Sequence, residues 1–477
     1  MITSKIPPAP DIPDPNVSQS GSGASTRLTM PAMDPKIDPN APRRQAFRGP
    51  LVHFLADPGA AAATELAPDA VAYFTDGLLL VENGLVWAAG AARDLSPRLD
   101  GSWELTAYPD KLILPGFVDC HIHYPQTDMI AAHGEQLLQW LERYTFPVEA
   151  RFADAAHAAE VAEVFLDELL RNGTTTALVL ATVHPQSVDA FFRAAAARQL
   201  RMIAGKVLMD RNAPDVLLDT PESGYADSRA LIERWQGVGR LGYAITPRFA
   251  ATSSEAQLEQ AGKLAAEYPE AYVHSHVAEN RSEVAWVAEL FPWSRSYLDV
   301  YDRFGLLRER AVYAHCLHLD ADDRRRMADS GAAMAFCPTS NLFLGSGLFD
   351  LAAADAAGVR VGVATDVGAG TSFGLLQTLG DACKVLQLNG QFLQPLRAFY
   401  LATLGGARAL YLDDRIGNFS PGKEADFVVL DPAATPLMAR RMQSMQDLAE
   451  QLFVLMTLGD DRAVAATYVL GELLHRR

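Results

Sequence analysis

The chain has 477 residues, of which 49% are hydrophobic, and it carries a formal net charge of −17 at neutral pH. This length and apolar content predict a large buried core, and the acidic balance argues against nucleic acids or anionic membranes as partners. No apolar run approaches the roughly 18 residues of a membrane span, and the four cysteines lack paired spacing, so we expect a cytoplasmic protein without disulfides.

Residues 1–45 are predicted to form a disordered leader. They hold nine of the chain's 28 prolines and a Ser/Gly-rich stretch, with almost no apolar periodicity. Such a segment cannot bury enough apolar surface to offset the entropy lost on ordering, and it lacks the apolar core of a signal peptide. Met30 or Met33 is an alternative start of the protein.

Short β-type patterns stand at both ends of the remaining chain. The segments with this pattern are residues 50–55, 73–81, 85–88, 426–430 and 466–474. The last of them is a hairpin pattern around Gly471. Two separated β-rich ends that flank a long middle predict a small discontinuous β-sandwich domain, built from residues 46–113 and 414–477.

The middle of the chain, residues 114–413, alternates apolar strand patterns with amphipathic helical ones. The strand patterns are residues 117–123, 174–181, 202–209, 243–249, 272–277, 312–316, 332–337 and 359–365. Helical patterns between them include residues 155–170, 255–265 and 282–290. Eight β-then-α units predict an α/β fold, a catalytic (β/α)₈ TIM barrel. In that fold the chemistry takes place at the carboxyl ends of the strands.

The first barrel strand ends in two histidines, His121 and His123, in the sequence PGFVDCHIH. Side chains alternate across a strand, so residues i and i+2 point the same way and both imidazoles can reach one point in space. Zinc and ferrous iron both favour imidazole nitrogen. The pair is therefore a candidate for two ligands of one metal ion.

Three later strands also end in residues of metal-ligand type. His276 ends the fifth strand, His315 ends the sixth, and Asp366 follows the eighth. His274 shares a strand face with His276, so either can be the ligand; we favour His276 because it lies nearer the strand end. His318 falls beyond the sixth strand and is expected in a loop. Together with the first pair, these residues predict one metal centre at the carboxyl ends of the barrel strands.

Glu279 stands three residues after His276, just past the fifth strand. A zinc ion lowers the pKa of its bound water from about 15.7 to about 7, which gives a metal-bound hydroxide at neutral pH. From its position the Glu279 carboxylate can take a proton from that water and pass it to a leaving nitrogen. Asp366 can accept a hydrogen bond from the same water. We therefore predict Glu279 and Asp366 as catalytic residues.

These motifs resemble the amidohydrolase superfamily of metal-dependent hydrolases. The resemblance rests on the strand LPGFVDCHIH, the later single histidines, the aspartate of the eighth strand and the tail IGNFSPGKEADFVVLD. No lysine stands at the end of a middle strand in a position to be carbamylated and bridge two metals. The resemblance therefore implies the mononuclear branch, with one Zn²⁺ (Fe²⁺ is not excluded). The ligands that it implies are His121, His123, His276, His315 and Asp366.

Four further segments are similar to the guanine deaminases within that superfamily. They are HIHYPQTDMIAAHGEQLLQWLERYTFPVEARF, ITPRF, SHVAEN and CPTSNLFLGSGLFD. This similarity implies hydrolytic deamination of guanine to xanthine and ammonia, with Glu279 as the proton shuttle and a homodimer as the assembly. The residues that it implies in contact with the base are His123, Gln126, Arg248, Phe249, His276 and Asp366.

The chemistry of three of these residues suits a flat purine. The amide of Gln126 and the guanidinium of Arg248 can bond the carbonyl oxygen and ring nitrogens of guanine, and Phe249 offers an aromatic face for stacking. Two alternatives stay open. One is a sister aminohydrolase acting on an oxidised purine, cytosine or a triazine; the other is a barrel that has lost catalysis.

Four residues near the predicted site are left undecided by the sequence. Trp140 and Phe146, which follow the first strand, fit a wall of the pocket and core packing equally well. Ser340 and Asn341 lie just past the seventh strand and could line the pocket, but the sequence does not decide their role.

Overall fold

The computed structural model of the chain describes residues 42–59, 69–133, 136–445 and 447–477. The predicted leader lies outside these residues as far as residue 41. Strand β1 (Arg44–Phe54) begins within the last residues of the predicted leader and continues into the first predicted β segment. The chain from Arg43 onward forms one compact unit.

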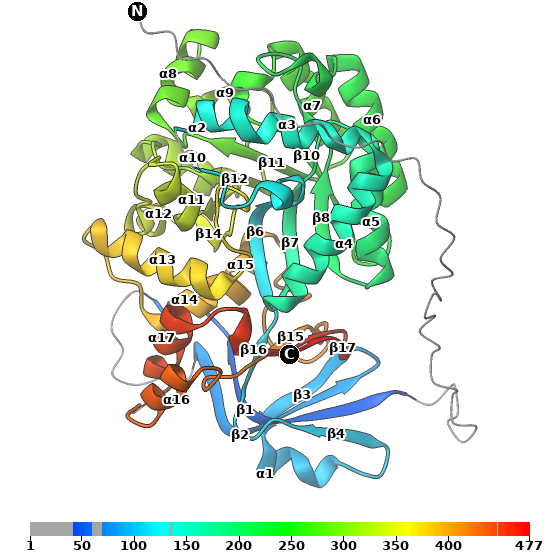
Figure 1. Cartoon of the computed structure of the whole chain (residues 1–477), viewed down its shortest axis with the longest axis vertical. Coiled ribbons are helices and arrows are strands. Elements are labelled where there is room, and N and C mark those ends of the chain that lie inside the picture. Colours follow the sequence, from blue (N-terminus) through cyan, green and yellow to red (C-terminus); the bar gives the residue numbers. More distant parts are fainter. Residues whose placement is uncertain (1–41, 60–68, 134–135, 446) are drawn as a thin grey trace, which may run out of the picture. The chain divides into compact units, whose positions relative to one another are not determined.

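Within the described ranges, eight parallel strands form a barrel in chain order (Figure 1). They are β6 (Phe117–His123), β7 (Thr174–Leu180), β8 (Arg201–Gly205), β10 (Gly242–Pro247), β11 (Tyr272–Val277), β12 (Ala311–His315), β13 (Ala333–Phe336) and β14 (Arg360–Val363). The Asp366 N–H donates to the His121 carbonyl at 3.0 Å, which joins the chain after β14 to β6 and completes the closure. The predicted barrel is confirmed, with strand bounds within two residues in most cases.

The third predicted strand differs from the sequence expectation because it is interrupted at Lys206. Its first part is β8, and its second part is the short β9 (Val207–Leu208), which pairs with β10. The barrel strands are otherwise almost wholly buried, as expected for strands covered by helices on the outside and filled by side chains within.

Helices cover the outside of the barrel (Figure 1). They are α4 (Ala155–Arg171), α5 (Pro185–Ala197), α6 (Pro221–Trp235), α7 (Glu255–Glu267), α8 (Arg281–Leu290), α9 (Tyr297–Arg303), α10 (Ala321–Ser330), α11 (Pro338–Phe343), α12 (Leu351–Ala357) and α13 (Leu375–Leu388). In α4, the buried residues Val161, Phe165 and Leu169 recur every four positions, and the Asp154 side chain caps the first turn. The three predicted helices correspond to α4, α7 and α8.

Both ends of the chain contribute to a separate mixed sheet. Its strands are β1, β2 (Val71–Glu82), β3 (Leu85–Ala91), β4 (Trp103–Ala107), β5 (Leu112–Pro115), β15 (Phe427–Leu430), β16 (Val464–Val469) and β17 (Glu472–Arg476). The order is β17-β16-β15-β5-β1-β2-β3, with β4 beside β1. A single bridge between Leu85, the first residue of β3, and Glu424 links this edge strand to the segment that leads into β15. Phe47, Phe427 and Tyr468 pack inside, the last two stacked with ring centroids 4.3 Å apart.

A buried charge cluster lies between the barrel and this sheet. Arg240, just before β10, contacts the Glu424 carboxylate at 2.6 Å and also pairs with Asp426. Arg201, the first residue of β8, pairs with Glu424 as well. Because Asp426 directly precedes β15, these pairs connect the amino-terminal ends of barrel strands to the carboxyl-terminal part of the sheet.

The remaining helices are short or lie near the carboxyl terminus. They are α1 (Ala92–Leu95), α2 (Leu137–Trp140), α3 (Phe146–Ala150), α14 (Pro395–Tyr400), α15 (Gly406–Ala409), α16 (Pro436–Met442) and α17 (Leu448–Leu458). A π-helical turn at Leu141–Thr145 joins α2 to α3, at the end of the barrel away from the sheet (Figure 1). Among the helices of the described residues, none is both long and apolar enough to cross a membrane.

Candidate active site

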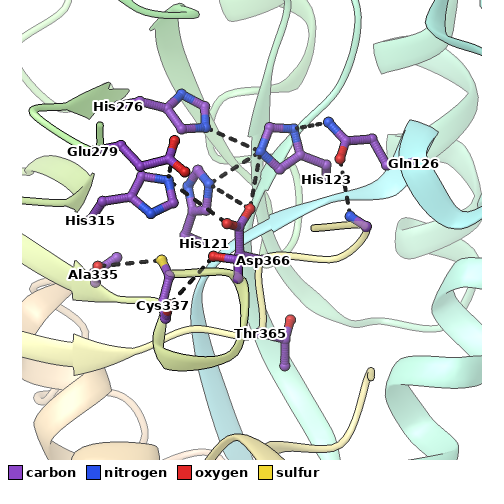
Figure 2. Close-up of polar contacts among 12 residues, drawn as sticks. His121, His123, Gln126, His276, Glu279, His315, Ala335, Cys337, Thr365 and Asp366 are labelled. Carbon is purple, nitrogen blue, oxygen red and sulfur yellow. Dashed lines mark hydrogen bonds and ion pairs between the residues drawn. The ribbon is translucent and has the colours of Figure 1, made fainter. Parts of the chain in front are cut away.

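The imidazoles of His121 and His123 meet at the carboxyl end of β6, as strand alternation requires. Their Nε2 atoms are 3.1 Å apart, and Asp366 Oδ1 lies 3.2 Å from the first and 3.4 Å from the second. His276 Nε2, from β11, is 3.2 Å from His123 Nε2. His315, from β12, completes the group, with its Nε2 atom 3.8 Å from Asp366 Oδ2 (Figure 2).

Hydrogen bonds on the far side of each ring orient these imidazoles. His276 Nδ1 is 2.7 Å from the Arg248 carbonyl oxygen, which can only accept, so Nδ1 carries the hydrogen and Nε2 presents a lone pair to the cluster. His315 Nδ1 is held in the same way by Asn341 Oδ1 at 2.9 Å. Such partners fix the tautomer of a metal-binding histidine. Asn341, undecided from sequence, therefore orients His315.

His274 occupies a deeper position on β11 and contacts a different atom. Its Nε2 atom is 2.7 Å from His121 Nδ1, on the side of that ring opposite the cluster. The structure thus brings His276 into the cluster and places His274 behind His121. His318 lies outside the cluster, where its Nε2 atom contacts the Ser346 carbonyl at 3.1 Å.

The donor set fits a divalent metal ion. Burial lowers the pKa of His121, His123 and His276 well below the ordinary value, so these imidazoles are neutral. Burial acts on His315 in the same direction, but the negative charges of Glu279 and Asp366 outweigh the effect of burial. The net result is a raised pKa of His315. Converging imidazole lone pairs beside a carboxylate are what zinc or ferrous iron prefers.

Cys337 is a neighbour of this cluster that the sequence does not single out as a site residue. Its Sγ atom lies close to ligand atoms of His315 and Asp366. Burial raises the pKa of its thiol well above the usual value, and Sγ donates to the Ala335 carbonyl at 3.4 Å. Cys337 is therefore a neutral thiol packed against the cluster.

Glu279 lies at the edge of the cluster. Its Oε2 atom is 3.3 Å from His315 Nε2, and its Oε1 atom accepts from the Ser346 hydroxyl at 2.9 Å. Burial raises the pKa of Glu279 to about 7. The buried Glu283 carboxylate holds the backbone, because it accepts the Glu279 N–H at 2.9 Å. A carboxyl with this pKa can both accept and give up a proton at neutral pH.

A pocket opens over this cluster. Eight of the nine predicted site residues line it, and His121 lies beneath, fully buried. Trp140 also lines the cavity, and its buried indole N–H has no partner among the residues that the structure describes. Phe146 instead packs against Arg248, whose guanidinium carbon is 5.7 Å from the ring centroid. Ser340 is buried outside the cavity wall.

The predicted base-contacting residues Gln126 and Arg248 share one partner that sequence reasoning missed. Glu149, in α3, has one carboxylate oxygen 3.2 Å from Gln126 Nε2 and the other 2.6 Å from Arg248 Nη1. Its position within the segment FPVEARF carries no local pattern that separates it from a surface glutamate. Only the packing of α3 on the barrel reveals the contact. Ser346 was missed for the same reason.

Lys206 directly follows the third barrel strand, and its ammonium pairs with a residue outside the cluster. It lies between β8 and β9, with 1% of its side chain exposed, and its ammonium pairs with Asp219. The structure therefore offers no bridging ligand for a second metal at this lysine.

Comparisons with known proteins agree with this geometry. Residues 112–474 match the sequence profile of the Amidohydrolase family. Over 408 residues the chain is 55% identical to the guanine deaminase of Escherichia coli (strain K12), covering 86% of this chain and 93% of that protein. A solved structure of E. coli guanine deaminase superposes with a TM-score of 0.87 at 53% identity, covering 91% and 100% of the two chains. A structure of guanine deaminase from C. acetobutylicum with bound guanine in the active site gives a TM-score of 0.81 at 27% identity, with coverage of 91% and 100%.

Proposed function

The chain belongs to the amidohydrolase family, and we propose that its barrel catalyses the hydrolytic deamination of guanine to xanthine and ammonia. The observation that carries this function is the joint placement of two groups of residues in one cavity. Converging imidazoles and a carboxylate form its floor, and a guanidinium, an amide and an aromatic ring form its wall. Relatives named guanine deaminase and probable guanine deaminase align with most of the length of this chain.

A single divalent ion fits the floor of this cavity. The residues that would hold it are His121, His123, His276, His315 and Asp366. We favour zinc, and ferrous iron shares the same preference for these donors. When bound, such an ion supplies Lewis-acid chemistry that lowers the pKa of water towards neutrality.

Glu279 moves the protons of the reaction. Its carboxylate takes a proton from the attacking water, whose oxygen forms a bond to the ring carbon that carries the exocyclic amine. Glu279 then gives this proton to the adjacent ring nitrogen. It next takes the remaining proton of the hydroxyl now bound to the carbon and passes it to the amine, so that the new carbonyl forms as the carbon–nitrogen bond breaks and ammonia leaves. The pKa of about 7 allows both steps at neutral pH. Asp366 accepts a hydrogen bond from the same water.

The wall of the cavity holds the base in one orientation. Arg248 donates to the carbonyl oxygen of guanine, and the Gln126 amide bonds a neighbouring edge of the ring. Phe249, which is 5% exposed, offers its face to the flat base. Holding the reacting carbon in register over the floor lowers the barrier by several kcal/mol.

The organisation of the protein around this site is also proposed. Residues 46–113 and 414–477 form one discontinuous domain beside the catalytic domain of residues 114–413. The chain works as a homodimer in the cytoplasm, in keeping with its resemblance to the guanine deaminases. Light scattering on the purified protein measures the assembly, and a monomeric mass contradicts the dimer.

A substrate panel with defined metal content tests the function. Protein loaded with zinc, and separately with ferrous iron, is assayed on guanine, an oxidised purine, cytosine and a triazine. We expect loss of the ultraviolet band of guanine with release of one ammonia, at a higher kcat/KM than for the other bases. Preference for another base in the panel contradicts the substrate, and absence of any bound metal contradicts the mechanism.

A further inference from the structure

We propose that Glu149 is a positioning residue that fixes Arg248 and Gln126 together and thereby sets the preference for a purine that carries a ring carbonyl. This inference rests on the proposed function, because it concerns how the same cavity selects its base. Glu149 does not line the cavity, so its effect on a bound base passes through the two residues that do.

One carboxylate joins two parts of the barrel that are far apart in the sequence. Gln126 follows β6, Arg248 follows β10, and Glu149 lies between them in α3. Oε2 of Glu149 is 2.6 Å from Arg248 Nη1, and Oε1 is 3.2 Å from Gln126 Nε2. The side chains of Glu149 and Arg248 are only 1% and 3% exposed, so solvent does not weaken this contact.

The contact leaves most of the guanidinium free to meet a base. Within the described part of the chain, the Arg248 guanidinium donates a hydrogen bond to one side chain, the carboxylate of Glu149. A guanidinium has five N–H donors, so several remain for a carbonyl oxygen in the cavity. A buried guanidinium also needs a compensating charge, which this carboxylate supplies. The Phe146 ring, on the same helix as Glu149, packs against the cation.

The same carboxylate selects the orientation of the Gln126 amide. The Gly368 N–H donates to Gln126 Oε1 at 3.0 Å, while Glu149 accepts from Nε2. An obligatory donor on one side and an acceptor on the other allow only one of the two amide orientations. Gln126 Nε2 also lies 3.0 Å from His123 Nδ1, so Glu149 is one of three contacts that hold the amide. Loss of the Glu149 charge removes that contact and, at the same time, releases the guanidinium.

A purine without the ring carbonyl separates this role from a structural one. Guanine offers its carbonyl oxygen to Arg248, whereas 2-aminopurine has the same ring and exocyclic amine without that oxygen. If Glu149 orients the Arg248 guanidinium, removal of the Glu149 carboxylate weakens the binding of guanine more than the binding of 2-aminopurine. A purely structural ion pair affects both substrates equally.

The decisive experiment compares Glu149→Gln with Glu149→Asp and Asp219→Asn in the full-length, metal-loaded protein. In Glu149→Gln we expect the KM for guanine to rise about 10- to 100-fold with a smaller change in kcat, and the preference for guanine over 2-aminopurine to narrow about tenfold. Glu149→Asp keeps the negative charge and should recover part of the wild-type KM for guanine and part of the preference over 2-aminopurine. Asp219→Asn breaks another buried ion pair, with Lys206, outside the cavity, and should leave the preference unchanged.

Several results overturn the proposal. A folded, metal-loaded Glu149→Gln protein with the wild-type KM for guanine and the wild-type preference contradicts the proposal. An equal loss of activity on guanine and on 2-aminopurine also contradicts it. So does a narrowing of the preference in Asp219→Asn as large as that in Glu149→Gln. If neither Glu149 variant folds, the carboxylate is a structural ion-pair partner and the proposal is wrong. Failure of the wild-type protein to deaminate guanine is a separate result, which contradicts the proposed function itself.

Discussion

Replacing Glu279 by glutamine tests the centre of the proposed mechanism with little change of shape. Glutamine keeps an oxygen that can accept the Ser346 hydroxyl, which lies 2.9 Å from Glu279 Oε1 in the wild-type protein. It cannot take up a proton from water. Because Glu279 lies beside His315 but outside the groups of residues that could hold the metal, we expect the variant to bind metal as the wild-type protein does.

The expected loss of activity follows from the protonation of Glu279. With a pKa of about 7, its carboxyl is close to half protonated at neutral pH, which suits both proton uptake and proton release. Loss of a general acid–base group of this kind lowers kcat by about 10²- to 10⁴-fold. The assay is the ultraviolet change of guanine together with ammonia release, and the metal content is measured on the same sample. Ser346→Ala keeps the carboxylate and should lose far less activity.

Two results refute this reasoning. A kcat for Glu279→Gln within about tenfold of the wild-type value shows that another group moves the proton. Loss of the metal from the variant shows that Glu279 is a ligand rather than a proton carrier. A loss in Ser346→Ala as large as that in Glu279→Gln assigns the essential contact to the hydroxyl instead.

Three further substitutions test other parts of the structure. His274→Phe removes the partner of His121 Nδ1 and should weaken metal binding about 10- to 100-fold, measured by competition with a chelator. Arg240→Met leaves the buried Asp426 carboxylate without a cation, whereas Glu424 keeps its contact with Arg201, and the variant should lower the free energy of unfolding by about 3–5 kcal/mol in urea. Burial lowers the pKa of His53 to about 4 from 6.5, so the folded state binds fewer protons than the unfolded state between these values. Stability should therefore fall by up to about 1.4 kcal/mol per pH unit as the pH drops through that window, and His53→Phe should remove this part of the slope.

Each of these expectations has a contradicting outcome. Unchanged chelator competition in His274→Phe shows that the ring behind His121 does not orient it. A change below about 1 kcal/mol in Arg240→Met is what an exposed ion pair gives and contradicts the buried cluster. Parallel pH–stability curves for wild-type and His53→Phe proteins show that His53 titrates normally in the folded state.

Much of the fold could be predicted from the sequence because its signals are local. Buried parallel strands appear as apolar runs, and amphipathic helices between them appear as a period near four. The interruption at Lys206 was missed, because a single polar residue inside an apolar run does not show where strand pairing stops. A β-sandwich domain built from both ends of the chain was predicted from its two separated halves, and the strands from these halves pair in one mixed sheet. The bridge from Leu85 to Glu424 joins residues distant in sequence and has no local signal.

The sequence by itself determined which side chains gather at the cluster. Strand alternation aims His121 and His123 the same way, and a parallel barrel brings the carboxyl ends of its strands to one face. These two rules bring His315, Asp366 and one histidine of the fifth strand to the same place, and they leave both His274 and His276 as candidates for that histidine.

Only the tertiary structure decided how those side chains are held. It put His274 behind His121, Asn341 on His315, Ser346 on Glu279, and Glu149 between Arg248 and Gln126. Each of these contacts joins segments at least 23 residues apart in sequence, such as the pair formed by Glu149 and Gln126. The relative placement of such segments depends on how loops and helices pack over the barrel. Local periodicity carries no information about that packing, so the metal-type cluster could be predicted while its supporting hydrogen bonds could not.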